Sequence, residues 1–101
     1  MNESKERLQD ILQTKREEIL RIATKHGAKN VRIFGSTVRG GAGPESDVDF
    51  LVDVDPVHSS WFPAGLILDL EELLGQKVDV VTEDSIYWLL RRRILKEARP
   101  L

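Results

Sequence analysis

An apolar strand interrupted by two acidic residues places the tightest constraint on what this chain can fold into. The segment DVDFLVDV, residues 47–54, is β-branched and apolar enough for a buried strand, yet it carries Asp47 and Asp49. Because side chains alternate across a strand, these carboxylates share one face, and Val48 and Phe50 share the other. Without a counter-charge the two carboxylates repel each other, so one stays protonated or the strand is destabilised. A bound cation removes that conflict, and the pattern therefore favours a metal site on a sheet.

Apolar residues at three- and four-residue steps predict three helices, and β-branched runs predict three strands. Gly27 and Gly75 are the expected stops of the first two helices, since glycine readily adopts the left-handed conformation found there. The order of elements predicts an α/β (α+β) fold, a small mixed β-sheet with helices packed on it. Helices are expected at 4–25, 63–75 and from Asp84 or Ser85 to Pro100, the last carrying Ile86, Leu89, Leu90, Ile94 and Leu95; strands are expected at 31–34, 47–54 and 77–81.

Length and composition exclude several classes of protein. A chain of 101 residues is expected to form a single domain, residues 1–101, around one core. A net charge of -2 provides no global attraction to nucleic acid. The absence of cysteine excludes disulfides and thiolate metal sites and fits a reducing compartment. No apolar run approaches the roughly 20 residues of a membrane span, and the N-terminus is charged, so a cytoplasmic location is expected.

The Gly-Ser turn after the first strand is the expected phosphate position. At Gly35 the backbone can approach a ligand closely, and Ser36 can open a helical turn whose N–H groups and hydroxyl face an anion. Asp79 interrupts the third strand, KVDVV, and joins Asp47 and Asp49 if that strand runs beside the second. Mg²⁺ and Mn²⁺ bind carboxylate oxygens together with substrate phosphates, and three carboxylates can hold two ions about 3.5–4 Å apart. This combination indicates phosphoryl or nucleotidyl transfer.

The segment GSTVRGGAGPESDVDFLVDV resembles the G-S-x-x-R-G...S-D-x-D-[LF]-x-V signature of the minimal nucleotidyltransferases, members of the DNA polymerase β-like superfamily. The resemblance covers nearly the whole chain, including the later aspartate in VDVV and the tail RRRILKEARPL. It implies a polymerase β-like nucleotidyltransferase core. It also implies roles for individual residues, namely triphosphate binding by Gly35 and Ser36, two metal ions held by Asp47 and Asp49, Asp79 as third ligand and base, and Arg39 as a phosphate contact or a brace of the turn.

The resemblance further implies the reaction and the partners. The family transfers a nucleoside monophosphate from NTP to a hydroxyl, so we expect two Mg²⁺ ions, or Mn²⁺, as cofactors and ATP as the substrate. Many minimal members are MntA-type antitoxins, whose partner is a HEPN-domain ribonuclease toxin that they silence by adenylylating a tyrosine. A hetero-oligomer with such a toxin is therefore expected, with no membrane and no direct nucleic-acid contact. Thr37, Val38, Glu45 and Phe50 depart from the commonest family residues, but none stands at a phosphate or metal position.

Rival functions lead to different expectations. A non-enzymatic antitoxin would neutralise its toxin by binding alone, and its acidic residues would serve only nucleotide or metal binding. A small-molecule nucleotidyltransferase, such as one that modifies an aminoglycoside, resembles this chain but carries additional acceptor-binding domains. A P-loop NTPase is excluded because no G-x-x-x-x-G-K-[ST] motif occurs. Template-directed polymerisation is disfavoured because the chain has no basic excess to hold a template.

Other polar and aromatic residues have ordinary structural interpretations. Strand-end solvation is expected for Asp53 and Asp55, and a solvated helix face for Asp69, Glu71 and Glu72. His26 and His58 lack the spacing of metal ligands. Trp61 and Phe62 are interpreted as a core plug or hydrophobic staple rather than a base-stacking shelf. Arg91 to Arg93 lie within the last predicted helix, where they form either a partner or RNA surface or the usual charge near a helix C-terminus.

Overall fold

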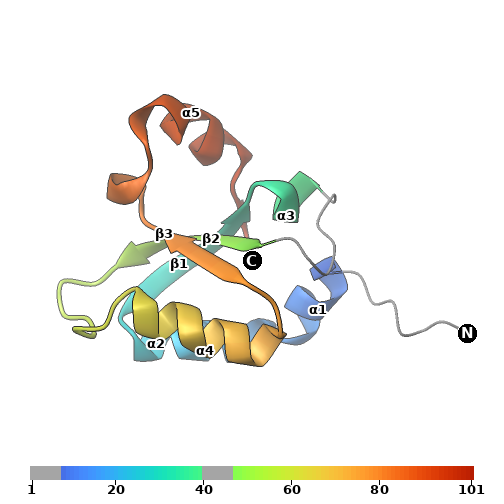
Figure 1. Ribbon diagram of the computed structural model, residues 1–101, viewed down its shortest axis with the longest axis vertical. Helices are drawn as coiled ribbons and strands as arrows, with labels where there is room; N and C mark the ends of the chain where they lie inside the picture. The colour runs from blue at the N-terminus through green and yellow to red at the C-terminus, as the bar shows by residue number, and fades with distance from the viewer. Residues whose placement is uncertain (1–7, 40–46) are drawn as a thin grey trace, which may run out of the picture.

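The computed structural model describes residues 8–39 and 47–101, so the predicted helix start at Ser4 and the turn containing Glu45 lie outside the described residues. The described chain forms a four-stranded mixed sheet in the order β3-β2-β1-β4, with helices on both faces (Figure 1). The α/β prediction is therefore confirmed. The elements are α1 (Leu8–Thr14), α2 (Arg16–Lys25), β1 (Ala28–Phe34), α3 (Ser36–Arg39), β2 (Val48–Val54), α4 (Ala64–Leu74), β3 (Val78–Val81), the 3-10 turn η1 (Glu83–Ser85), α5 (Trp88–Glu97) and β4 (Arg99–Pro100).

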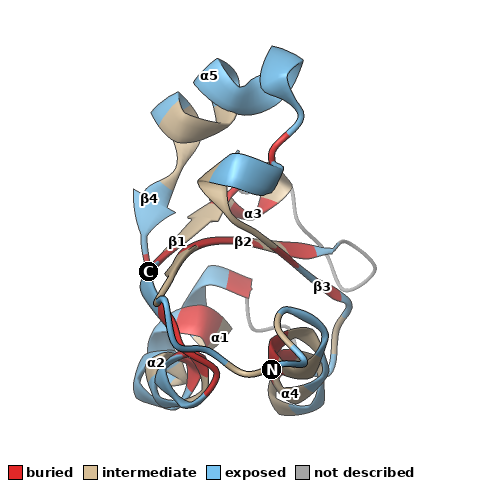
Figure 2. Cartoon of the chain, turned by 90° about the vertical axis from the view of Figure 1, so that its left-hand side faces the viewer, coloured by how far each residue is buried: buried red, intermediate tan, exposed pale blue. Residues whose placement is uncertain are grey.

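The sheet separates two unequal apolar clusters. Val48, Phe50 and Val52 of β2 pack against α1, α2 and α4 in the larger cluster. Alternation along the strand directs Leu51 to the opposite face, where it is buried with Phe34 and Ile86 in a smaller cluster beneath α5. Figure 2 shows α1, α2 and α4 on one side of the sheet and α3 and α5 on the other. The acidic face of β2 is therefore the face that carries the smaller apolar cluster.

The first predicted helix is divided in two at Lys15. Hydrogen bonding continues across this residue, since Lys15 N–H donates to Ile11 O and Ile19 N–H donates to Lys15 O, both at 2.9 Å. The division is a bend that lets Leu12 of α1 and Ile19 of α2 enter the same core. Gly27 is left-handed, with φ +83°, which confirms it as the stop after α2. The following strand then begins at Ala28, three residues earlier than the predicted start.

The C-terminal region differs most from the prediction. A fourth strand, β4, pairs antiparallel with β1 through Arg32 opposite Pro100 and Ile33 opposite Arg99, and no such strand was predicted. The last helix begins at Trp88 rather than after Asp84 or Ser85, because Thr82 and Ser85 cap the short η1 turn reciprocally. It ends at Glu97, since Ala98 is already extended. Its apolar residues are also less buried than their spacing suggests, with Leu89 57% and Leu90 46% exposed.

Candidate active site

Strand pairing brings two of the three predicted acidic residues side by side. β2 and β3 run parallel, with Asp49 directly opposite Asp79, so the condition under which Asp79 joins the other two acids is met. Directly opposed residues of neighbouring strands point to the same face. Asp47 lies just before the start of β2 and is exposed, as is Asp79, whereas Asp49 is half-buried. The structure thus places the three acids at one end of the β2–β3 pair.

The charges of Asp79 and Asp47 act on the carboxyl group of Asp49. Burial raises the pKa of Asp49 to about 6, with further upward contributions from the charges of Asp79 and Asp47 and a smaller opposing one from Arg39. The charge cluster predicted from the sequence is therefore present, and it weakens the charged form of Asp49 relative to an ordinary aspartate. A divalent cation would compete for the position of that proton.

The backbone of Asp49 is held by Thr37, one of the residues that depart from the commonest family pattern. Asp49 N–H donates to Thr37 Oγ1 at 3.1 Å, across β2 and α3. Thr37 is only 1% exposed and is one of the two buried polar residues in the described chain. A hydroxyl at this position therefore satisfies a backbone donor and fixes the acidic strand against the Gly-Ser turn. Its burial inside a four-residue helix was not apparent from sequence periodicity.

Gly35 allows the closest approach between the turn and the acidic strand. Its φ is +69°, and a Cβ added there would lie 2.6 Å from Asp49 Oδ2. The space that glycine leaves is therefore used by the carboxylate of Asp49 itself. Gly35 O also accepts hydrogen bonds from Val38 N–H and Arg39 N–H at 3.0 and 3.2 Å, which opens α3 at Ser36, where the sequence allowed a helical turn.

The N–H group of Gly35 faces a carboxylate of the same chain. Gly35 N–H donates to Glu97 Oε1 at 3.0 Å, and Arg39 Nη1 donates to Glu97 Oε2 at 2.6 Å. Arg39 therefore forms an ion pair, one of the two roles considered for it. Glu97 lies at the end of α5, and no spacing or motif linked it to the turn, because the contact depends on how β4 returns the chain to β1.

The described residues do not by themselves form a closed metal site. Within 8–39 and 47–101, no three acidic or histidine side chains converge tightly enough to hold a metal ion. The donor chemistry nevertheless fits Mg²⁺, because Asp49 is a half-buried carboxylate flanked by two others that disfavour its charge. Mg²⁺ commonly uses one or two carboxylates and takes its remaining ligands from water and substrate phosphates. Such an ion would depend on the nucleotide to complete its coordination.

This arrangement predicts a pH-dependent affinity for Mg²⁺. The pKa of Asp49 is raised from 3.8 to about 6 in the metal-free chain, so below pH 6 the ion must displace a proton. We expect affinity to rise by nearly tenfold per pH unit well below pH 6 and to level off above pH 7, with roughly three-quarters of a proton released per site at pH 5.5. Calorimetric titration in two buffers of different ionisation enthalpy measures that proton release. An affinity that is constant between pH 5 and 7 would contradict the assignment.

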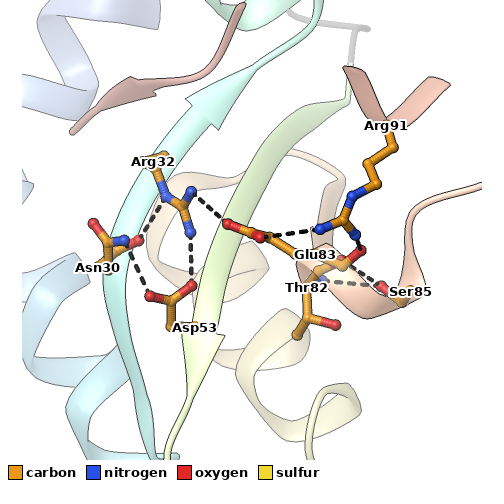
Figure 3. Close-up of polar contacts among 7 residues, drawn as sticks. All are labelled: Asn30, Arg32, Asp53, Thr82, Glu83, Ser85 and Arg91. Atoms are coloured by element: carbon orange, nitrogen blue, oxygen red, sulfur yellow. Dashed lines mark hydrogen bonds and ion pairs between the residues drawn. The ribbon is translucent and has the colours of Figure 1, made fainter. Parts of the chain in front are cut away.

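A second polar cluster lies near the other end of β2 from Asp49 and has a structural role. Arg32 Nη2 donates to Asp53 Oδ1 at 2.8 Å, and Arg32 Nη1 contacts Glu83 Oε2 at 3.4 Å (Figure 3). Arg91 Nη1 donates to Glu83 O at 2.7 Å, which connects α5 to η1. Asp53 is therefore an ion-pair partner rather than a merely solvated strand end, and Asp55 likewise contacts Lys29 at 2.9 Å. This cluster fixes the start of α5 over the sheet.

The remaining aromatic and histidine predictions have mixed outcomes. Trp61 is 75% exposed, so its interpretation as a core plug is wrong, whereas Phe62 is partly buried against the main core. His26 is buried and its Nε2–H donates to Asp69 Oδ2 at 2.7 Å. That hydrogen bond holds the pKa of Asp69 below its usual value. Asp69 is thus a partner of His26 and not only part of a solvated face.

Comparison with known proteins establishes the class of protein. Residues 7–101 match the family model described as "Nucleotidyltransferase domain". The chain therefore belongs to the nucleotidyltransferase domain family and is an enzyme of that class. The names of its relatives specify a reaction. The protein adenylyltransferase MntA of Thermococcus cleftensis is 38% identical over 89 residues, which cover 80% of this chain and 90% of the relative. A Methanocaldococcus jannaschii protein, named provisionally a protein adenylyltransferase, is 44% identical over 81 residues, covering 80% and 87%.

Solved structures show the same fold. One described provisionally as a minimal nucleotidyltransferase superposes with a TM-score of 0.79 at 42% identity, covering 91% of this chain and 94% of that one. A chain of a toxin–antitoxin structure solved with AMP-PNP superposes with a TM-score of 0.69 at 20% identity, covering 83% of this chain and 69% of that one. The predicted resemblance to minimal nucleotidyltransferases is confirmed. In the described part of the chain, no helix is both long and apolar enough to cross a membrane.

Proposed function

We propose that this chain is a Mg²⁺-dependent protein adenylyltransferase that transfers AMP from ATP to a tyrosine hydroxyl of a partner HEPN-domain toxin and thereby acts as an antitoxin. The observation that carries the proposal is the pairing of Asp49 with Asp79 directly beside the turn at Gly35. This acidic pair and turn lie in a chain of the nucleotidyltransferase family. Relatives named protein adenylyltransferase, and the fold shared with a chain of a toxin–antitoxin structure solved with AMP-PNP, support the choice of reaction and partner.

In the proposed site, the acidic residues bind the metal and the turn binds the phosphates. Asp47, Asp49 and Asp79 would hold Mg²⁺, which when bound neutralises phosphate charge and polarises the α-phosphorus. Gly35 N–H, the Ser36 hydroxyl and Arg39 would bind the β- and γ-phosphates. Thr37 is a positioning residue, because it holds the Asp49 backbone in register with the turn.

Asp79 is proposed as the base of the transfer step. It is exposed on β3, where an acceptor hydroxyl of another chain can approach it. The acceptor oxygen would form a new bond to the α-phosphorus while the bond from that phosphorus to the bridging oxygen breaks. Pyrophosphate leaves with the electrons of the broken bond, and the hydroxyl proton passes to Asp79. The product is an AMP ester of the acceptor.

The direct test is transfer of label from α-labelled ATP. Wild-type chain, Asp47→Asn and Asp79→Asn would each be incubated with Mg²⁺ and a HEPN-domain protein encoded in an adjacent reading frame. We expect label on a tyrosine of that protein with wild type and its loss with both variants. If the partner remains unlabelled while the wild-type complex still forms and neutralises the toxin, the adenylyltransferase assignment is wrong and neutralisation occurs by binding alone.

A further inference from the structure

The carboxylate of Glu97 occupies the anion position of the Gly-Ser turn. One of its oxygens accepts from Gly35 N–H at 3.0 Å and the other from Arg39 Nη1 at 2.6 Å. The Glu97 side chain is only 18% exposed, whereas its partner Arg39 is half exposed, so a ligand can reach the contact from the Arg39 side. A carboxylate held by a backbone N–H and a guanidinium uses the same donors, in the same manner, as a phosphate group does.

We propose that Glu97 is an internal competitor of the triphosphate: it occupies the phosphate position in the free protein and leaves when nucleotide binds. This inference rests on the proposed function, because it takes Gly35 and Arg39 as the phosphate donors. Gly35 has a single N–H, which cannot donate fully to Glu97 and to a phosphate oxygen together. Two anions at the same position also repel each other. Occupation by Glu97 therefore reduces the fraction of chains that can accept nucleotide.

The backbone around Glu97 restricts how the competitor can leave. Ala98 N–H donates to Ile94 O at 2.9 Å, and Leu101 N–H donates to Val31 O at 3.1 Å. Between them, Arg99 lies opposite Ile33 in the antiparallel pair of β4 with β1. The chain on both sides of Glu97 is thus fixed to helix and sheet. Release therefore occurs by rotation of the Glu97 side chain and not by departure of α5.

Substitution of Glu97 distinguishes a competitor of the triphosphate from a structural brace of Arg39. Binding of inorganic triphosphate and of ATP, each with Mg²⁺, would be measured by calorimetry on the full chain for wild type, Glu97→Ala and Glu97→Gln. We expect roughly 5- to 30-fold tighter binding for Glu97→Ala, from the loss of a charge-assisted hydrogen bond that competes with the ligand. The affinity of Glu97→Gln should lie between those of wild type and Glu97→Ala, since its amide oxygen can still accept one of the two hydrogen bonds.

Glu72→Gln provides a matched control for the change in net charge. Glu72 is exposed on α4, on the opposite side of the sheet from α5, so its replacement should leave the affinity unchanged (Figure 2). Thermal unfolding of each variant shows whether the fold is retained. A second readout is the amide resonance of Gly35, which should move on adding triphosphate to wild type and should already be shifted in ligand-free Glu97→Ala.

The binding measurements distinguish Glu97 as a competitor from Glu97 as a structural brace and from the absence of a nucleotide site. Equal or weaker triphosphate binding by both Glu97 variants would overturn the inference and make Glu97 a structural brace of Arg39, while leaving the proposed function intact. If neither wild type nor the variants bind triphosphate, both the competitor and the nucleotide site are wrong. Tighter binding by Glu97→Ala together with the Gly35 shift supports the inference.

Discussion

Asp49→Asn is expected to lower AMP transfer by at least about 10²-fold while leaving the chain folded and equally or more stable. The loss of activity follows from removing the central carboxylate, which pairs with Asp79 and approaches Gly35. The retained stability follows from two observations. The hydrogen bond to Thr37 uses the backbone N–H of residue 49 and survives the substitution. The carboxylate itself is also disfavoured in its charged form, because burial and its acidic neighbours raise its pKa to about 6.

The pH dependence of that stability difference has a definite sign. A carboxyl with a folded pKa of about 6 and an unfolded value near 3.8 binds its proton more tightly in the folded state. The contribution of the Asp49 carboxyl to the free energy of unfolding is fully present below pH 4 and is lost as the pH rises through 6. Asparagine does not titrate, so the unfolding free energy of Asp49→Asn relative to wild type should increase between pH 4 and pH 7.5 without Mg²⁺. Urea unfolding at both pH values measures it.

Asp84→Asn is the control for Asp49→Asn. Asp84 is exposed in the η1 turn, outside the proposed site, so activity and the pH dependence of stability should match the wild type. The assignment of Asp49 would be wrong if Asp49→Asn retained most of the transfer activity. It would also be wrong if this variant were strongly destabilised at pH 7.5, because the carboxylate would then be a structural group of the fold.

Gly35→Ala is expected both to destabilise the chain and to abolish nucleotide binding. The alanine would adopt φ +69°, and its Cβ would lie 2.6 Å from Asp49 Oδ2. The backbone conformation alone costs about 1 kcal/mol, and displacement of the turn or of the carboxylate brings the total to about 2–3 kcal/mol. Either displacement also separates the phosphate donors from the acidic residues. Urea unfolding and calorimetric titration with ATP and Mg²⁺ measure the two effects.

Gly75→Ala isolates the backbone contribution. Gly75 has a nearly identical φ of +70°, but nothing lies within 4 Å of a Cβ added there. Its replacement should therefore show the conformational cost of about 1 kcal/mol without steric conflict and with normal ATP binding. Equal destabilisation by the two substitutions, with ATP binding retained in Gly35→Ala, would contradict the close approach of the turn to Asp49.

An acidic face on the second predicted strand could be predicted from the sequence because it depends on local rules. Alternation puts Asp47 and Asp49 on one face of a strand, and two further apolar runs suffice to predict a sheet around them. The structure adds the parallel register that brings Asp79 opposite Asp49. Those predictions needed only the period of the strand and the order of the elements.

The contacts that shape the turn depend on tertiary structure and were not predictable in the same way. Glu97 reaches Gly35 across 62 positions because β4, a two-residue strand containing a proline, pairs with β1. So short a strand has no periodicity to detect, and proline is uncommon within sheets. The family pattern gives no role to Thr37, whose hydroxyl accepts a hydrogen bond from Asp49 N–H. Leu89 and Leu90 show the opposite failure, since the apolar helical pattern predicts their burial and the structure leaves them 57% and 46% exposed.

In the proposed function, metal and triphosphate bind together at the acidic end of β2. The most direct measurement replaces Mg²⁺ with paramagnetic Mn²⁺ and records amide line broadening in the isotope-labelled chain with ATP. We predict that broadening is centred on residues 35–37, 47–50 and 78–80, and that Asp49→Asn abolishes it. Broadening centred instead on Asp53 and the acidic η1 turn, or spread over the surface without a centre, would contradict the account.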